Sequence, residues 1–268
     1  MALVARVRRV TVIASLGLIL AGAAAAQPAV GVNPPAAVKA YSDIAKLPDW
    51  SGSWAPDRAV EAAELKNNPL PWNAKAQAQI DALQKQSDAG NPKLIFWGCF
   101  PLGMPSWMLI NHNYMEILFS PGRVTVLGEV DGNRLRRIHT DGRPHPADPD
   151  PTFHGHSIGH WEGGTLVVDT VGIVPQSPIA AHETVGLANN GGMHIVERIR
   201  LRSQDVLEDV ITVTAPNVLT RPWTSTRLFN RERGAENEII EGQCVRGDYN
   251  EGVDKDDNAT FTPYVPPQ

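Results

Sequence analysis

The feature that most constrains this chain is a series of short strand-like runs separated by turn signals, which begins at Met115. Each run is rich in β-branched, aliphatic or aromatic residues, and Gly, Pro, Asn or Asp separates most runs from the next. Asp131-Gly132-Asn133 is a strong hairpin signal. The pattern predicts eight or nine strands, joined mostly by hairpins: 115–120, 123–130, 135–140, 157–161, 165–171, 194–201, 206–214, 224–230 and 238–245.

A long series of hairpins leaves two open sheet edges, and closure into a barrel removes both of them. We therefore expect a mainly all-β fold, an antiparallel meander that closes into a lipocalin-like β-barrel of about eight to nine strands. A barrel of ~8 strands has an interior that holds one small ligand. A two-sheet sandwich with a filled interior is the competing fold.

The N-terminal residues predict an export signal. A basic start is followed by the apolar run 10–20 and by four alanines that end at Ala26. We expect a signal peptide over 1–26, a flexible lead-in over 27–48, one barrel domain over 49–245, and a C-terminal tail over 246–268. One peripheral helix is predicted at about 73–87, because Asn73 suits an N-cap and the apolar stripe behind it is thin.

Charge and compartment limit the partners. Removal of the signal takes away three arginines and no acid, so the formal net charge moves from −5 to −8. An acidic protein without a basic stripe suits neither nucleic acid nor an anionic membrane surface. We expect a periplasmic or secreted protein that binds no nucleic acid and does not insert into the membrane.

Two cysteines, Cys99 and Cys244, belong to a compartment that permits disulfides. A bridge between them would close a loop of most of the domain and stabilise it by ~4–5 kcal/mol in the chain-entropy model. We expect this disulfide. Two buried thiols, or one reactive thiol, are the alternatives.

Several motifs together resemble a group of exported bacterial proteins whose function is uncharacterised. They are CxPxGMP at 99–105, DGRPHP at 141–146, SIGHWEG at 157–163, TLVVDT at 165–170 and Glu197-Arg198. The resemblance covers roughly Trp50 to Cys244 and implies export and a β-rich fold, but no catalytic assignment. A separate, fainter resemblance to lipocalin-like barrels rests on Gly52-x-Trp54 and the number of strands.

The candidate site residues cluster around the run 151–170. On an extended strand His154, His156 and His160 share one face, although Gly155 and Gly159 would bend the chain. With His194 from another strand, these four histidines form the candidate metal site. The spacing matches no zinc signature, so no cofactor is expected and a divalent metal is the alternative.

Acid–base chemistry without a metal needs only an imidazole and a carboxylate that orients it. The catalytic candidates are His156, His160, His194, Asp169 and Glu197. Glu197 shares a strand face with two isoleucines, which requires a buried partner. The alternative for Glu197 is therefore a structural ion pair with an arginine such as Arg137 or Arg143.

The substrate-binding candidates are His154, Trp161, Trp54 and Arg143, since large indole surfaces favour an aromatic ligand and arginine holds carboxylates. The chain has no G-x-S-x-G elbow and no glycine-rich phosphate loop. We predict an exported barrel enzyme, a lyase, isomerase or hydrolase acting on a small hydrophobic or aromatic molecule. A non-catalytic lipocalin-type carrier and a histidine-ligated metal-binding protein are the alternatives.

Overall fold

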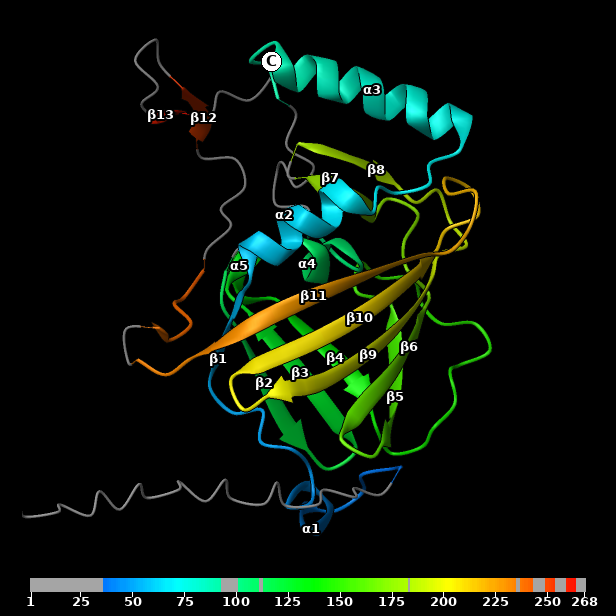
Figure 1. Cartoon of the computed structure of the whole chain (residues 1–268), viewed down its shortest axis with the longest axis vertical. Helices are drawn as coiled ribbons and strands as arrows, with labels where there is room; N and C mark the ends of the chain where they lie inside the picture. The colour runs from blue at the N-terminus through cyan, green and yellow to red at the C-terminus, as the bar shows by residue number, and fades with distance from the viewer. Residues whose placement is uncertain are drawn as a thin grey trace, which may run out of the picture. The chain divides into compact units, whose positions relative to one another are not determined.

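The structure, a computed structural model, describes residues 36–92, 101–110, 113–182, 184–234, 237–242, 249–253 and 259–263. Within them, nine strands close a barrel in the order β1-β11-β10-β9-β6-β5-β4-β3-β2 (Figure 1). These strands are β1 (Ser53–Pro56), β2 (Met115–Ser120), β3 (Arg123–Gly128), β4 (Leu135–His139), β5 (His156–Glu162), β6 (Thr165–Val171), β9 (His194–Ser203), β10 (Val206–Thr214) and β11 (Trp223–Glu232).

The expected β-barrel is confirmed, but its connections differ from a simple antiparallel meander. β4 and β5 run parallel, with Ile138 paired to Ser157, because the long loop between them returns the chain to the same end of the barrel. The ninth strand is β1, which pairs with both β11 and β2. The predicted strand over 238–245 is wrong in its described part, since 238–242 is not extended in a sheet.

Side chains alternate between the interior and the outer face along each barrel strand, as the pleat requires. On β5 the inward row is Ser157, Gly159 and Trp161, while His156 and His160 face outward. Gly159 lies where the interior is crowded: a Cβ there would meet Ile138 Cγ2 at 2.9 Å. The small residues therefore fix the inward face of β5, and the histidines take the other face.

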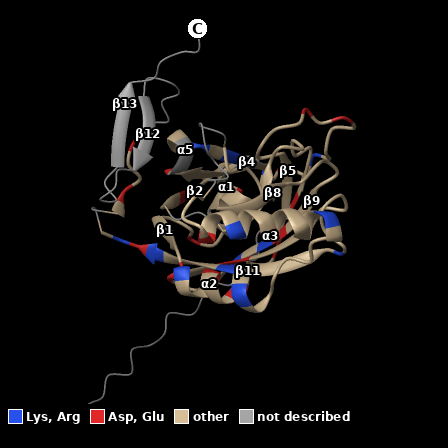
Figure 2. Ribbon diagram, turned by 90° about the horizontal axis from the view of Figure 1, so that it is seen from above, with Lys and Arg blue, Asp and Glu red and all other residues tan. Residues whose placement is uncertain are grey.

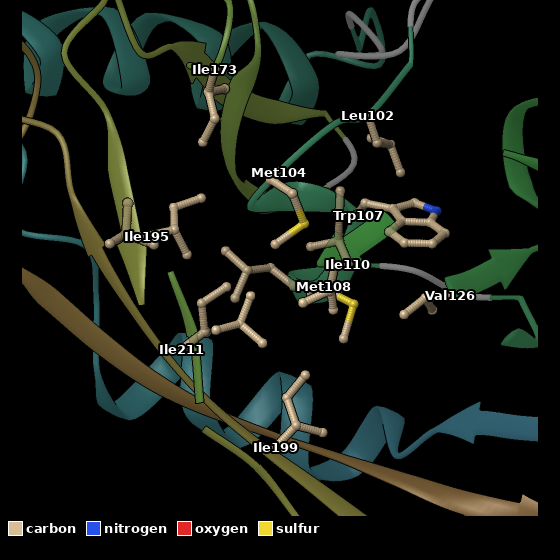
Figure 3. Packing of buried hydrophobic residues seen from close by; sticks show 14 of the residues in the cluster. Leu102, Met104, Trp107, Met108, Ile110, Val126, Ile173, Ile195, Ile199 and Ile211 are labelled. Carbon is tan, nitrogen blue, oxygen red and sulfur yellow. The ribbon is translucent and has the colours of Figure 1, made fainter. Parts of the chain in front are cut away.

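One end of the barrel is filled by the short helix α4 (Ser106–Leu109). Met104, Trp107 and Met108 are buried and pack with the inward isoleucines of β9 and β10 (Figure 3). Gly128 on β3 leaves room for this insertion, because a Cβ there would meet Trp107 Cζ2 at 2.7 Å. The interior at this end is therefore occupied by core side chains of the chain itself.

Aromatic rings form a second packing group. Trp50 lies 5.2 Å from Trp161 and 5.5 Å from Phe119, between ring centroids. Trp54 donates its indole N–H to the carbonyl of Trp50 and carries the guanidinium of Arg231 4.4 Å above its ring. These rings are core, and α1 (Tyr41–Ile44) lies beside β2 near them.

The predicted helix is present as α3 (Ala74–Asp88), and Asn73 caps it by accepting from the amide of Ala76. The sequence reading missed α2 (Arg58–Asn67), which packs on β11, and the turn-like α5 (Val130–Asn133). It also missed the hairpin of β7 (Pro178–His182) and β8 (Val185–Ala188), which contacts α3. None of the helices in the described ranges has the length and apolar character needed to cross a bilayer.

The described part of the lead-in is tied to the barrel rather than free. Val38 is buried, donates its amide to the carbonyl of Thr140, and accepts from the amide of Gly122. In the predicted tail, β12 (Tyr249–Val253) and β13 (Ala259–Pro263) form a hairpin. The predicted disulfide between Cys99 and Cys244 lies outside the described residues. Figure 2 shows basic and acidic residues interspersed over the described elements.

Candidate functional site

Four histidines and one aspartate meet on the outer face of the barrel, and we call them the outer cluster: His139, His145, His156, Asp169 and His194. Asp169 Oδ1 lies 3.0 Å from His145 Nε2 and 3.0 Å from His194 Nε2. His145 Nδ1 lies 2.8 Å from His156 Nδ1, and His139 stacks on His156 with centroids 5.3 Å apart. The carboxylate of Asp169 thus joins two imidazoles, and the imidazole of His156 extends this hydrogen-bonded series.

Strand register explains why these side chains meet. On β6 Asp169 faces outward and is paired with Ile158 of β5 and Val196 of β9. His156 begins β5 and His194 begins β9, so both enter from the strand ends beside Asp169. His145 arrives from the loop between β4 and β5. The barrel strands place four members of the cluster, His139 included, and the loop of the parallel crossover supplies the fifth, His145.

The hydrogen bonds fix the ring tautomers when the imidazoles are neutral. A carboxylate oxygen only accepts, so His145 and His194 each donate their Nε2–H to Asp169. His145 Nδ1 then carries a lone pair and accepts the Nδ1–H of His156. His156 Nε2 is left with the lone pair. The arrangement ends in a basic nitrogen at the far side of His156 from the carboxylate.

The surroundings favour a neutral His156. Burial, then the charges of His145 and Arg143, lower the pKa of His156 below its usual value. Burial, Arg143 and His156 likewise lower the pKa of His139. Asp169 and His194 remain about two-fifths exposed, so the cluster is open to solvent. A neutral imidazole near pH 7 is the form that accepts a proton.

The structure gathers three of the five predicted catalytic residues, His156, His194 and Asp169, and separates the other two. His160 is exposed and lies 3.2 Å from Glu162 on the same strand. Glu197 is buried inside the barrel. His156 and His160 lie on the outer face of β5 and do not face the barrel interior. Sequence reasoning missed His145 and His139, of which His145 was visible only as part of the turn-like DGRPHP motif.

Glu197 forms the buried ion pair that its position required, but with Arg136 rather than Arg137 or Arg143. Arg136 Nη1 lies 2.7 Å from Glu197 Oε1, and Nη2 contacts Oε2. On β4, Arg136 and Ile138 point inward, whereas Leu135 and Arg137 point outward. Arg143 is exposed and pairs with Asp141 of its own turn, with Nη2 2.6 Å from Oδ2.

The ion pair belongs to a ring of polar side chains on the inward faces of six adjacent strands, which we call the inner belt. Arg136 Nη2 also donates to Ser157 Oγ at 3.2 Å and to Thr170 Oγ1 at 3.0 Å. On β10 and β11, Asp209 is paired in register with Arg227. Every member is buried: Arg136, Ser157, Thr170, Glu197, Asp209, Ser225 and Arg227.

Asp209 is the least expected member of the inner belt. It is fully buried, and neither carboxyl oxygen has a hydrogen-bond partner within the described residues. Burial and then the charge of Glu197 raise the pKa of Asp209 well above its usual range. Leu207, Ile211 and Val213 share its strand face, so the sequence held the same signal that singled out Glu197.

The four histidines of the alternative metal site do not come together. His154 lies beside α4 with its ring 5.0 Å from that of Trp107, whereas His156, His160 and His194 are outside the barrel. No group of three or more His, Cys, Asp or Glu in the described part of the chain is arranged to hold a metal ion. Burial, together with Arg136 and Arg134, lowers the pKa of His154 to about 4, so it stays neutral.

Trp54 and Trp161, which were predicted to bind the substrate, are buried in the core. Three open pockets are lined by described residues. One lies between residues 44–52 and β2, one between α3 and β8, and one at the turn between β10 and β11. The first measures about 550 Å³. The outer cluster therefore remains the place where the predicted catalytic residues come together.

Comparison with protein-family models and with curated protein sequences gives no match for this chain.

Proposed function

We propose that this protein is an exported enzyme that transfers protons at the outer cluster. The observation that carries the proposal is the continuous hydrogen-bonded chain from Asp169 through His145 to His156. An acid, an oriented imidazole and a terminal base in contact are what general base catalysis needs. The substrate class is a small hydrophobic or aromatic molecule, and the reaction is an elimination, an isomerisation or a hydrolysis.

In this proposal His156 Nε2 removes the proton from the substrate, and its Nδ1 proton passes to His145 Nδ1. His156 ends neutral in its other tautomer, and the positive charge rests on His145. That charge lies next to the carboxylate of Asp169, whose Oδ1 is 3.0 Å from His145 Nε2. The relay is favourable because an imidazolium beside a carboxylate is stabilised, whereas burial and the charge of Arg143 oppose a cation on His156.

The surface beside the cluster suits an apolar substrate. Ile158 and Val196 are half-buried and flank Asp169 on the two neighbouring strands. Aliphatic side chains on an outer sheet face give a small molecule an apolar contact next to the base. His194 donates its Nε2–H to the same oxygen, Oδ1 of Asp169, and keeps the carboxylate in place for His145.

The test uses 5-nitrobenzisoxazole, a small aromatic carbon acid. Removal of its ring C–H proton forms a nitrile, breaks the N–O bond and releases a coloured phenolate. We expect turnover by the wild type above that of free imidazole. In H156A we expect a loss of ~100-fold, within the range of general base catalysis.

The matched control is H160A, which removes another outward histidine from the same strand. We expect H160A to turn over the probe at the wild-type rate, with circular-dichroism spectra alike for all three proteins. Equal rates for H156A and H160A would remove the proposal.

A further inference from the structure

The inner belt and the neighbouring side chains of His154 and Trp107 contain polar atoms that the fold leaves without partners. Among the described residues these are Asp209 Oδ1 and Oδ2, Arg227 Nη2, Arg136 Nε, both ring nitrogens of His154, and Trp107 Nε1. A buried polar atom without a hydrogen bond costs about 1–3 kcal/mol, and native proteins retain few of them. Seven such atoms on five side chains are a large cost for one region of a core.

These five side chains form one connected group. Asp209 and Arg227 are register partners across β10 and β11. The charge of Arg136 acts on both Asp209 and His154, and the ring of His154 meets Trp107 edge-on at 5.0 Å. Arg227 Nε donates to the carbonyl of Leu109, which joins the belt to α4. The unpartnered atoms therefore lie in one region of the core, between the barrel wall and α4.

The group is rich in donors. Arg136 Nε, Arg227 Nη2 and Trp107 Nε1 only donate, and neutral His154 offers one N–H. A protonated Asp209 adds an O–H donor to its remaining acceptor. The complementary ligand group is thus an oxygen that accepts several hydrogen bonds.

Apolar side chains border the same region. Met104 and Met108 reach between Ile195 and Ile211 on one side and Trp107 on the other (Figure 3). Methionine is unbranched and adaptable, and it is used where a surface must accommodate different molecules. Ile199 is the β9 partner of Asp209 and continues the apolar border toward the belt.

We propose that the inner belt is a binding site for a small apolar molecule with a carbonyl or carboxylate oxygen, which Asp209 and Arg227 hold. The apolar body lies against Met104 and Met108, whose side chains move to admit it. This site is inside the barrel and is independent of the outer cluster.

Three probes of similar size separate the contributions: acetophenone has a carbonyl, benzoate a carboxylate, and ethylbenzene neither. Calorimetric titration of the wild type should show one equivalent of acetophenone or benzoate, bound at least tenfold more tightly than ethylbenzene. Binding of acetophenone alone identifies a neutral ligand, and binding of benzoate alone an anionic one. No saturable binding of either oxygen probe, or equal affinity for ethylbenzene, overturns the proposal.

Variants locate the site. D209L should weaken binding of the preferred probe at least tenfold, whereas H156A on the outer face should leave it unchanged. R227K keeps the charge, loses the forked donor, and should also weaken binding about tenfold. If D209L does not fold, D209N replaces it: the amide N–H still donates, so affinity should stay within about threefold while R227K remains weak. Wild-type affinity in R227K, or the same loss in H156A, overturns the assignment.

Methyl-labelled methionine gives a second readout. The methyl signals of Met104 and Met108 should shift on addition of the bound probe and should follow the calorimetric saturation curve. Unchanged signals from both residues at saturation would contradict the placement.

Discussion

The outer cluster and the inner belt share the strands β4, β5, β6 and β9 and take opposite faces of them. His156 and Asp169 point outward, while the next residues, Ser157 and Thr170, point inward. Outside, Asp169 joins two imidazoles and stays about two-fifths exposed. Inside, Glu197 is fully buried and forms an ion pair with Arg136, which is equally buried.

Because of this difference in burial, we expect substitutions on the outer face to change the proposed activity with little effect on stability, and substitutions inside to change stability itself. Half-exposed ion pairs contribute little to stability because water screens them. Buried charges contribute or cost several kcal/mol according to whether their partners are present. Changes in the inner belt should therefore act mainly on the free energy of unfolding, and changes in the outer cluster mainly on the rate.

The largest effect is expected for R136M, which leaves Glu197 buried without its counter-charge. We expect a loss of about 3–5 kcal/mol in the free energy of unfolding, measured by urea denaturation at pH 7. The double variant R136M/E197L replaces the pair by apolar side chains and should recover most of the loss. A single variant as stable as the wild type would show that the pair is not the electrostatic centre of the belt.

His154 should make the fold sensitive to acid. Its pKa is about 4 in the folded chain and about 6.5 when unfolded. Between these values the unfolded chain binds the proton first, so stability falls as pH drops from 6.5 to 4, by up to about 3 kcal/mol. H154F should flatten this part of the curve. His139 and His156 act in the same direction, so a smaller slope should remain; an unchanged slope would contradict the burial of His154.

Asp209 should act in the opposite direction. Because its pKa is raised in the folded chain, the fold keeps a proton that the unfolded chain loses above pH ~4, and stability falls as pH rises. D209N cannot ionise. We expect its Tm at pH 8 to exceed that of the wild type by about 2–4 °C, which is about 1 kcal/mol for a domain of this size. The difference should vanish at pH 4; a lower Tm at pH 8 would refute the raised pKa.

The smallest change in stability is expected on the outer face. D169N should alter the free energy of unfolding by less than about 1 kcal/mol, because the site is half exposed. Its rate with 5-nitrobenzisoxazole should fall at least ~10-fold, since an amide does not stabilise the imidazolium of His145. E162Q changes the exposed carboxylate beside His160 and is the matched control. If E162Q lost as much rate as D169N, the loss in D169N would not be specific to the outer cluster.

Much of the barrel could be predicted because alternation and turn residues are local signals. Eight predicted strands recur as β2 to β6 and β9 to β11 within a few residues. The parallel β4–β5 pair could not be predicted, because it depends on where a long loop returns. Strand β1 was missed as a partner since its pairing with β2 spans some 60 residues.

Only part of the candidate site could be predicted, because alternation along a strand is again a local signal. Alternation shows which residues share a face but not which face is inside. Ser157 and Gly159 face inward because the crowded interior admits small side chains there, which turns His156 outward. His145 meets the cluster through the loop conformation, which no periodicity reports. Asp209 was missed although an acid among aliphatic residues on one strand face was a readable signal.

The most direct measurement of the central claim is the nitrogen NMR spectrum of the histidine rings at pH 7. We expect a neutral His145 protonated at Nε2 and a neutral His156 protonated at Nδ1, with coupling across the 2.8 Å contact between their Nδ1 atoms. A His156 that is charged at pH 7, or protonated at Nε2, would contradict the relay and leave the outer cluster without its base.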